Sequence, residues 1–442
     1  MPLIDHVASS PEIVSSADVV IIGAGIIGVA TALELLQRGL SVVVVEKGEV
    51  AAEQSSRNWG WCRQMGRDAR ELPLIKVSLD LWRGMNARIG AETGFRSCGI
   101  VYLSETNEQL AAKVKWHDEN AKPHGLPTKV ITGAEAAALA PGSSIAWKGG
   151  IYTVEDGRAE PFIAVPAMAR AVQSRGGKIY TRCAARGIEK KAGRVCSVVT
   201  ERGTIATASV VLAGGYWSER FLGNLDVVFP QLGVVNSVMR TSAVDLGHQR
   251  TFSGNRFAAR KRLDGGYTVT HNHFSVAELT PQHFRHGRDF LPLLMLDAKG
   301  VKIRMGKRFI DEWQLARRWQ LDQPSPFEQV RVLDPEPYDG ILDDAAAALK
   351  TAYPAFKDMQ IAERWAGMID ATPDAVPVID SIDQVPGLFM ASGFSGHGFG
   401  LGPGAGKLMA EMVTGESRCV DATAFRFKRF SDGTKHRPST GL

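Results

Sequence analysis

The sequence predicts an α/β fold in which a Rossmann-type domain is interleaved with an α+β domain built on an antiparallel sheet. The first observation behind this prediction is a strand, a glycine turn, a helix and a second strand within residues 18–47. The second is the stretch 226–364, where short strand-like segments alternate with charged helical segments. The chain has 442 residues, too many for a single compact core, so we expect about two or three domains.

Residues 18–47 have the pattern of a strand–helix–strand unit. The β-branched run 19–22 predicts a buried strand, and it leads directly into the glycine-rich segment 23–28, Gly-Ala-Gly-Ile-Ile-Gly. An amphipathic helix is expected from about residue 27 to 37, with Gly39 as its C-terminal stop. A second apolar strand, 41–45, then ends at Glu46.

The spacing of the three glycines indicates a dinucleotide site. Gly23 permits the tight turn, Gly25 lets the backbone approach a pyrophosphate, and Gly28 lets the helix pack closely on the strand. Glu46 follows at about the 20-residue spacing where a carboxylate accepts hydrogen bonds from ribose hydroxyls. An acid at this place argues against a 2′-phosphate ligand, and it leaves NAD and FAD both open.

The segment after Glu46, residues 47–68, lacks helical or strand periodicity and is predicted to be a loop. A long irregular loop beside a nucleotide site is often functional. Its hydroxyl and amide side chains can donate to phosphate, and its arginines can hold anionic groups bidentately. These residues are Ser55, Ser56, Asn58, Arg57, Arg63 and Arg67. A solvated basic loop is the alternative.

The remaining elements follow from periodicity and from turn residues. Helices are expected at 71–89, 107–120, 133–139, 161–174 and 407–413, and strands at 99–103, 178–181, 195–200, 204–206, 208–212, 233–241, 256–261, 266–271 and 388–391. Two of these strands run into glycines, at 213–217 (AGGYW) and at 392–406 (SGFSGHGFGLGPGAG). The second glycine cluster precedes a helix, which is again an anion-binding arrangement.

Composition excludes several classes of protein. A net charge of +5 is too small to indicate nucleic-acid binding by itself. No apolar run reaches the length of a membrane span, and the N-terminus shows no secretory signal. Five cysteines without CxxC spacing predict free thiols, no zinc site and a cytoplasmic protein. The basic residues 425–442 are expected to form a solvated tail.

Three separated pieces together resemble the family of FAD-dependent amine and D-amino-acid oxidoreductases, which includes D-amino-acid dehydrogenase, glycine oxidase, sarcosine oxidase and γ-glutamylputrescine oxidase. The pieces are GAGIIG with Glu46, the AGGYW turn, and WAG…TPD…ASGFSGHGFGLGPGAG at 365–406. The resemblance implies FAD and a discontinuous FAD-binding domain made of 1–95, 150–225 and 365–442. Residues 96–149 and 226–364 would form the substrate-binding domain.

The resemblance also implies a set of cofactor-binding residues. They are Gly23, Ala24, Gly25, Ile26, Gly28, Glu46, Lys47, Ser55, Ser56, Arg57, Gly60, Trp61, Ala184, Ala213, Gly214, Gly215, Trp217, Gly367, Gly393, Phe394, Gly396, His397, Gly398 and Phe399. Members related to sarcosine oxidase bond the flavin to a cysteine just before the TPD element, and residues 368–372 contain none. FAD is therefore expected to be bound non-covalently. The lysine that assists oxygen in those members is also missing from 267–271, so the acceptor is either oxygen or a quinone or electron-transfer protein.

The expected reaction is oxidation of a C–N bond, with a hydride passing to flavin N5 and an imine that water hydrolyses. An arginine fork suits a substrate carboxylate, and the candidates are Arg63, Arg260 and Arg364. His271 and His273, expected on one face of a strand, could accept an ammonium proton. A 2-hydroxy acid or polyol dehydrogenase, or a flavin subunit of a larger electron-transfer complex, are the alternative functions.

Overall fold

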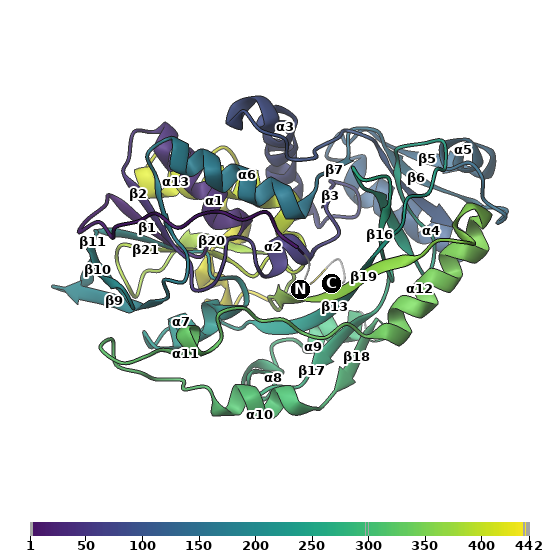
Figure 1. The fold of residues 1–442 in the computed structure, drawn as a ribbon. Helices are drawn as coiled ribbons and strands as arrows, with labels where there is room; N and C mark the ends of the chain where they lie inside the picture. Colours follow the sequence, from purple (N-terminus) through teal and green to yellow (C-terminus); the bar gives the residue numbers. More distant parts are fainter. Residues whose placement is uncertain (1–2, 297, 299, 436–437, 439–442) are drawn as a thin grey trace.

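The structure is a computed structural model that describes residues 3–296, 298, 300–435 and 438. Two large sheets organise it, a six-stranded sheet and a ten-stranded sheet, and Figure 1 shows them side by side along the long dimension of the molecule. This arrangement confirms the predicted fold class. The exact domain boundaries stay a prediction.

The six-stranded sheet carries the glycine turn. Its strand order is β20-β21-β12-β1-β2-β8, and only β20 runs antiparallel to its neighbour. The bounds are β1 Val19–Ile22, β2 Val42–Val45, β8 Lys178–Tyr180, β12 Ser209–Leu212, β20 Val378–Ser381 and β21 Leu388–Ser392. β1 and β2 are buried over their whole length, as expected for parallel strands covered on both faces.

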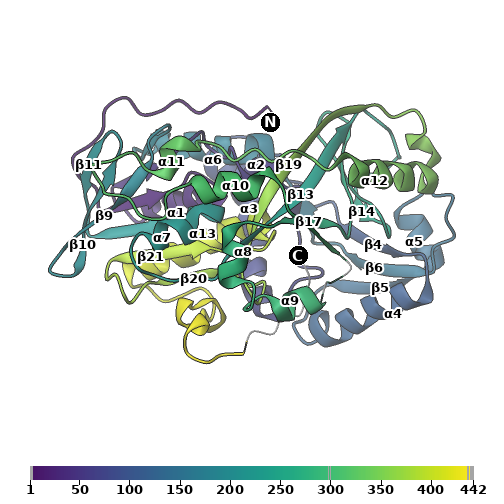
Figure 2. The ribbon, with the colours of Figure 1, turned by 90° about the horizontal axis from the view of Figure 1, so that it is seen from below.

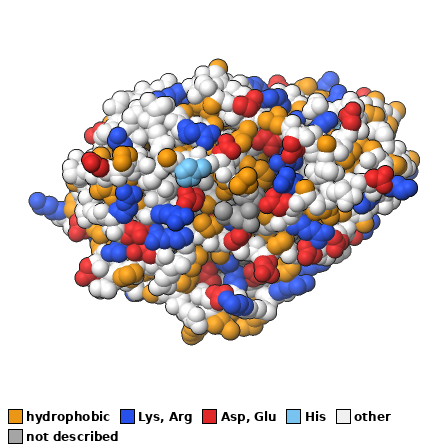
Figure 3. Space-filling model, viewed as in Figure 1, with side chains coloured by type: hydrophobic (Ala, Val, Ile, Leu, Met, Phe, Trp, Pro, Cys, Tyr) orange, Lys and Arg blue, Asp and Glu red, His pale blue; other side chains and the backbone are white. Residues whose placement is uncertain are grey.

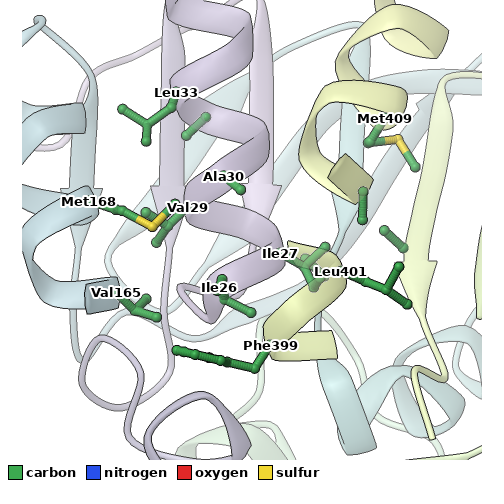
Figure 4. Packing of buried hydrophobic residues seen from close by; sticks show 14 of the residues in the cluster. Ile26, Ile27, Val29, Ala30, Leu33, Val165, Met168, Phe399, Leu401 and Met409 are labelled. Atoms are coloured by element: carbon green, nitrogen blue, oxygen red, sulfur yellow. The ribbon is translucent and has the colours of Figure 1, made fainter. Parts of the chain in front are cut away.

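Three helices pack on this sheet, α1 Ile26–Gln37, α6 Pro161–Ser174 and α13 Gly398–Thr414, and α3 Leu72–Ile89 packs on α13. Figure 1 shows α1, α6 and α13 on one side of the sheet. Figure 4 shows Val29 of α1 next to Met168 of α6, Leu401 of α13 on the other side of α1, and the Phe399 ring below Ile26 at the start of α1. The core of the nucleotide-binding region therefore lies between these helices and the sheet.

Helix α13 is longer than the sequence predicted, because it begins at Gly398 and not at 407. The glycines that favoured a loop are required for close helix packing. A Cβ on Gly406 would lie 2.6 Å from the carbonyl carbon of Ala30 in α1, and one on Gly404 would lie 2.9 Å from Ser78 Cβ in α3. The glycine run is thus the contact face of a helix.

The ten-stranded sheet contains the strands of the region predicted to bind substrate. Its order is β18-β17-β13-β16-β15-β14-β4-β6-β5, and β19 pairs with β13. The bounds are β4 Ile100–Ser104, β5 Thr128–Thr132, β6 Gly149–Thr153, β13 Leu232–Thr241, β14 Thr251–Ser253, β15 Ala258–Lys261, β16 Tyr267–Thr270, β17 Ser275–Glu278, β18 Val301–Arg304 and β19 Ile361–Ala371. Most of its pairs are antiparallel, but β14 with β4 and β17 with β18 are parallel.

Smaller elements lie between and beside the strands of the two sheets. They are α2 Gln54–Arg57, β3 Trp61–Cys62, β7 Gly157–Arg158, α4 Asn107–Trp116, α5 Gly133–Leu139, the meander β9 Ala185–Lys191, β10 Arg194–Thr200 and β11 Gly203–Ala206, and α7 Ser218–Gly223. The loop predicted after Glu46 therefore contains one helical turn, α2, and a short strand, β3, that pairs with β7.

An insertion follows β17 and packs against β13 and β19. It contains α8 Pro281–His286, α9 Leu291–Leu296, β18 and α10 Lys307–Gln314, and Figure 2 shows α8 to α10 together. Residues 315–338, with the short helix α11 Pro326–Gln329, connect α10 to α12 Asp339–Ala352. Phe284, Ile310 and Trp313 of the insertion are exposed.

The prediction of a solvated tail is wrong for residues 425–430. Phe425 and Phe427 are buried, and the guanidinium of Arg429 pairs with Asp374 at 3.1 Å. Aromatic side chains spaced along this basic segment anchor it against the sheet, where the sequence pattern showed only its charge. Residues 436–437 and 439–442 of the predicted tail lie outside the described residues.

Surface charge agrees with the modest net charge of the chain. Figure 3 shows basic and acidic side chains interspersed over the face that it presents, with apolar side chains between them. None of the helices among the described residues combines the length and the apolar character needed to cross a bilayer. The described residues also contain no group of three or more His, Cys, Asp and Glu side chains placed to hold a metal ion.

Candidate functional site

A cavity lies at the carboxyl ends of β1, β2 and β12, where a parallel sheet places its ligands. It extends to the loop after β21 and to the first turn of α13. Many of the predicted cofactor-binding residues line it: Gly23, Gly25, Ile26, Glu46, Lys47, Ser55, Ala213, Gly214, Gly215, Trp217, Phe394, Gly396, Gly398 and Phe399. The structure thus brings together residues from three distant parts of the sequence.

The three glycines of the turn differ in what surrounds them. Gly23 has φ +107°, and a Cβ there would lie 2.4 Å from the carbonyl oxygen of Ala213. A Cβ on Gly28 would lie 2.0 Å from the carbonyl oxygen of Gly23. At Gly25 the only atom within 4 Å of an added Cβ is Ser55 Oγ, at 3.0 Å. Gly23 and Gly28 therefore shape the turn, whereas Gly25 faces the cavity, as the motif predicts.

Glu46 closes the turn from the end of β2. One of its carboxylate oxygens accepts the N–H of Ala24 and the other accepts the N–H of Gly48, both at 2.8 Å. Burial raises the pKa of Glu46, while Lys47 and the two N–H groups oppose the rise. Because each carboxylate oxygen has a second lone pair, Glu46 still has acceptors for ribose hydroxyls.

Replacing Glu46 with Ala is expected to weaken FAD binding by about 1.5–3 kcal/mol, the contribution of hydrogen bonds to a charged group. Glu46→Gln keeps one acceptor oxygen and is expected to lose less. Equilibrium titration of the apoprotein with FAD measures both. If both variants bind FAD as the parent does, Glu46 is not a ribose ligand.

Glu53 is a cavity residue that the motif analysis did not include. Its carboxylate accepts Lys47 Nζ at 2.6 Å and Trp217 Nε1 at 3.0 Å, and Lys47 also lies over the Trp217 ring at 4.5 Å. Burial opposes ionisation of Glu53, but Lys47 and the hydrogen bonds outweigh it and lower its pKa. Glu53 therefore fixes two predicted cofactor residues, and no local motif marks it because Trp217 is distant in sequence.

At the other end of the cavity, Asp370 holds the loop before α13. Its Oδ2 accepts the N–H of Gly393 at 2.7 Å and lies 3.3 Å from Gln231 Nε2 and from Ser392 Oγ. Burial raises the pKa of Asp370 to about 6, although the hydrogen bond from Gly393 lowers it. This network orients the loop so that Gly396 and Gly398 face the cavity.

Several predicted cofactor residues do not line this cavity. They are Ala24, Gly28, Ser56, Arg57, Gly60, Trp61, Ala184, Gly367, Gly393 and His397. Arg57 is buried and donates to Asp334 at 2.5 Å and to the carbonyl oxygens of Ala52 and Ala366. These contacts connect α2 to β19, so the Arg57 guanidinium has a structural role in the fold that the sequence pattern did not indicate.

His397 pairs with a carboxylate beneath the helix start. Its Nδ1 lies 2.9 Å from Glu71 Oε2, and both side chains are buried. Burial and then Arg67 lower the pKa of His397, while Glu71 opposes this. Arg67 is itself buried, and burial and Arg63 lower its pKa to about 10. An added Cβ on Gly400 in α13 would lie 3.3 Å from Arg67 Nη2, so positive charge adjoins the N-terminal turn of this helix.

The three candidate arginines have different partners. Arg260 is fully engaged, because it donates to Trp59 O, to Glu160 at 2.8 Å and to Thr268 at 2.9 Å. Arg364 is partly exposed and pairs with Asp339 and Asp343.

Arg63 donates to the carbonyl oxygen of Met65 and lies 5.9 Å over the Tyr102 ring. In the described part of the chain, no carboxylate lies within salt-bridge distance of Arg63. Of the three candidates, Arg63 therefore has donors left for a carboxylate, although none of the three lines the cavity.

The two candidate histidines do not share a strand, because β16 ends at Thr270. His271 Nε2 lies 3.1 Å from Asp344 of α12, and the two imidazole rings are 6.4 Å apart. The prediction that alternation places both on one strand face is therefore wrong. Burial lowers the pKa of both rings, so both are neutral near pH 7. Neither lines the cavity.

The residues that line the cavity suit an elongated dinucleotide. Its lining begins at the Glu46 carboxylate, passes the glycine turn and ends at α13, so the N-termini of two helices, α1 and α13, adjoin it. Helix N-termini favour negatively charged groups. The side of the cavity near Trp217 and Phe221 is aromatic, which suits an adenine ring.

Comparisons with known proteins agree with this site. The family model described as FAD dependent oxidoreductase matches residues 18–412. The chain belongs to this family of FAD-dependent oxidoreductases. Within it, the protein is an enzyme of the amino-acid and amine oxidising group, which also contains the relatives named next.

Two solved structures and one curated relative illustrate the similarity. The L-amino acid deaminase of Proteus myxofaciens, in complex with anthranilate, is 35% identical with a TM-score of 0.93 and 97% of each chain covered. The L-amino acid deaminase of Proteus vulgaris is 34% identical with a TM-score of 0.92, over 96% of this chain and 100% of that one. The glycine oxidase of Pseudomonas aeruginosa is 25% identical, over 93% of this chain and 98% of its own length.

Proposed function

We propose that the protein oxidises the C–N bond of an α-amino acid, with L-amino acids as the first class to test and N-substituted amino acids as the second. The observation that carries this proposal is the similarity over 97% of the chain to a structure named as an L-amino acid deaminase. Arg63, with donors left over beside the aromatic residues Trp61 and Tyr102, supports a substrate that carries a carboxylate.

FAD, when bound, accepts a hydride from the substrate α-carbon at its N5 atom. The residues of this chain bind and orient the substrate. Arg63 holds the carboxylate through charge-assisted hydrogen bonds. The aromatic side chains Trp59, Trp61 and Tyr102 pack against one another beside Arg63 and form an apolar surface for the rest of the substrate. The amine must be neutral, since an ammonium nitrogen has no free electron pair to stabilise the forming imine.

A panel of substrates under anaerobic conditions tests this function. We expect L- or N-methyl amino acids to bleach the absorbance of the bound flavin, and ammonia or an amine to appear together with a 2-oxo acid. Bleaching by a 2-hydroxy acid or a polyol, without any response to amines, would replace this proposal with the alternative dehydrogenase. No bleaching by any compound would favour a flavin subunit of a larger complex.

FAD is expected to be held non-covalently. Residues 368–372, just before the TPD element, contain no cysteine. Acid precipitation should therefore leave the yellow colour in the supernatant. Colour that stays with the precipitated protein would show a covalent bond.

For the electron acceptor we propose oxygen or, alternatively, a quinone or an electron-transfer protein. The family lysine that assists oxygen has no counterpart in β16, whose sequence is Tyr-Thr-Val-Thr. Measuring turnover with oxygen and with a soluble quinone separates these acceptors. A cytoplasmic location remains part of the proposal, on the composition and the unpaired cysteines.

A further inference from the structure

Residues 315–338, here called the strap, run between α10 and α12 and cross the nucleotide-binding region on the way. Figure 1 shows this green segment passing from α10 by way of α11 to α12. Near its start, Arg220 of α7 donates to the carbonyl oxygens of Leu315 and Ala316, and Trp319 Nε1 donates to Arg186 O at 2.7 Å. Near its end, the N–H of Tyr338 donates to Ser237 Oγ at 2.9 Å.

The strap supplies one wall of the cofactor cavity. Phe327 of α11 lines the cavity, is 4% exposed, and lies with its ring 5.9 Å from Trp217 and 6.0 Å from Phe221. Trp319 packs on the outer side of Phe327 at 5.3 Å. The aromatic end of the cavity is therefore closed by a segment that is far from the glycine motif in sequence.

Besides the contacts at its ends and the pair of Asp334 with the buried Arg57, two groups of polar contacts fasten the strap. The inner group lies at the cavity: Lys47 Nζ donates to the carbonyl oxygens of Val330 and Arg331, at 3.0 and 2.9 Å, and the N–H of Leu333 donates to Glu53 at 3.0 Å. Lys47 and Glu53 also line the cavity. The same two side chains thus face the cofactor and the strap.

The outer group consists of two ion pairs that do not line the cavity. Arg186 of β9 pairs with Glu328 through two bonds of 2.9 Å. Arg331 pairs with Glu201, in the turn after β10, through two bonds of which one is 2.6 Å long. Both pairs join the strap to the β9–β10 meander. The four side chains are 12% to 36% exposed, so water reaches both pairs and can replace their hydrogen bonds when the strap moves.

We propose that the strap is a removable wall of the FAD site: the adenosine half of FAD enters and leaves when residues 315–338 detach from the meander, and bound FAD holds them closed. A ligand that binds only the closed form stabilises that form. Bound FAD must therefore stabilise the closed strap, and closure of the strap must strengthen FAD binding. The inference uses the assignment of FAD as the cofactor and is independent of which substrate is oxidised.

Charge-neutral variants of the outer ion pairs test this gate. The double variant combines Glu201→Gln and Glu328→Gln. Residue 201 keeps a side-chain oxygen for the N–H of Ala184, and residue 328 keeps one for the N–H of Ser325 at the start of α11. FAD association with the apoprotein and FAD dissociation are followed by flavin fluorescence. We expect both rate constants to rise together, by roughly 3- to 10-fold for two pairs of this strength, while the dissociation constant changes by less than either rate.

The matched control is Glu363→Gln, which removes a partly exposed ion pair with Arg240, 2.9 Å long, between β13 and β19. Its FAD rate constants are expected to equal those of the parent. If the double variant raises only the dissociation rate constant, the strap is an ordinary contact and not a gate. Unchanged rates in the double variant would overturn the proposal as well.

A second measurement on the unmodified protein is independent of any variant. Trypsin cleavage within the strap, at Arg331, should be faster in the apoprotein than in the FAD-loaded protein, with the fragments identified by mass. Equal cleavage rates with and without FAD would show that the cofactor does not hold the strap closed. Neither measurement uses an amine substrate, so a failure here is distinct from a failure of the proposed reaction.

Discussion

Replacing Gly28 with Ala is expected to give a protein that purifies without FAD. An added Cβ would lie 2.0 Å from the carbonyl oxygen of Gly23 and 3.2 Å from Ile21 Cγ2. Gly23 has little room to move away, because its N–H donates to Val45 O at 2.8 Å and even an added Cβ there would lie 2.4 Å from the carbonyl oxygen of Ala213. Either α1 or the turn must shift, and overpacking of this kind costs about 1–3 kcal/mol or more. We expect FAD affinity to fall by about 100-fold or more, which corresponds to about 3 kcal/mol.

Gly84→Ala is the matched control for this substitution. Gly84 lies within α3, and no atom lies within 4 Å of an added Cβ. The exchange is therefore expected to leave FAD binding unchanged and to stabilise the helix by about 0.5–1 kcal/mol. The ratio of flavin to protein absorbance, together with titration of the apoprotein with FAD, measures both variants. A Gly28→Ala protein that retains its full content of FAD would refute the role assigned to this glycine.

The glycine turn was predictable because its constraints are local. Gly23, Gly28 and Glu46 lie within one strand–helix–strand unit, so their spacing alone fixes the geometry that the structure shows. The parallel order of the sheet followed from the same reasoning, since two β-branched strands joined by a helix pair in parallel. The structure confirms both.

Contacts between distant segments could not be predicted in this way. Phe327 and the strap reach the cavity only because the chain returns from α10 to the nucleotide-binding region, and no periodic pattern marks that return. Asp370 holds the loop before α13 through a bond to Gly393. In both cases the position of a cavity residue depends on a partner supplied by another part of the fold.

Charged side chains show the same limit. The sequence offers Arg63, Arg260 and Arg364 as equivalent candidates, because a guanidinium alone does not reveal its partner. Only the fold shows that Arg260, whose side chain is 1% exposed, pairs with Glu160, whose side chain is 6% exposed. It also shows that Arg364 pairs with Asp339 and Asp343 of α12. Arg260 and Arg364 already have carboxylate partners, so Arg63 is the candidate that remains for the substrate carboxylate. No sequence motif makes this distinction.

Replacing Arg63 with Ala is expected to raise KM strongly for amino acids that carry a free carboxylate. Loss of a buried, hydrogen-bonded charge pair costs about 2–5 kcal/mol, which is a decrease in kcat/KM of about 30- to 4,000-fold. Arg63→Lys keeps the charge but loses the planar fork, so an intermediate loss is expected. Arg364→Ala, which removes an arginine paired at the surface, is the control and should leave KM unchanged.

The methyl ester of the substrate separates carboxylate binding from a general disturbance of the site. Esterification should lower kcat/KM of the parent enzyme about as much as the Arg63→Ala substitution does. In the Arg63→Ala variant esterification should lower kcat/KM little, because the arginine–carboxylate pair is already missing. The rate should also rise with pH in all of these proteins, as the bound amine loses its proton. His271 and His273 have lowered pKa values and are neutral over this range, so they do not reverse the slope. If the ester penalty in Arg63→Ala equals that in the parent, Arg63 does not bind the carboxylate, and the anion must be held by another donor near the first turn of α13, where Arg67 is buried.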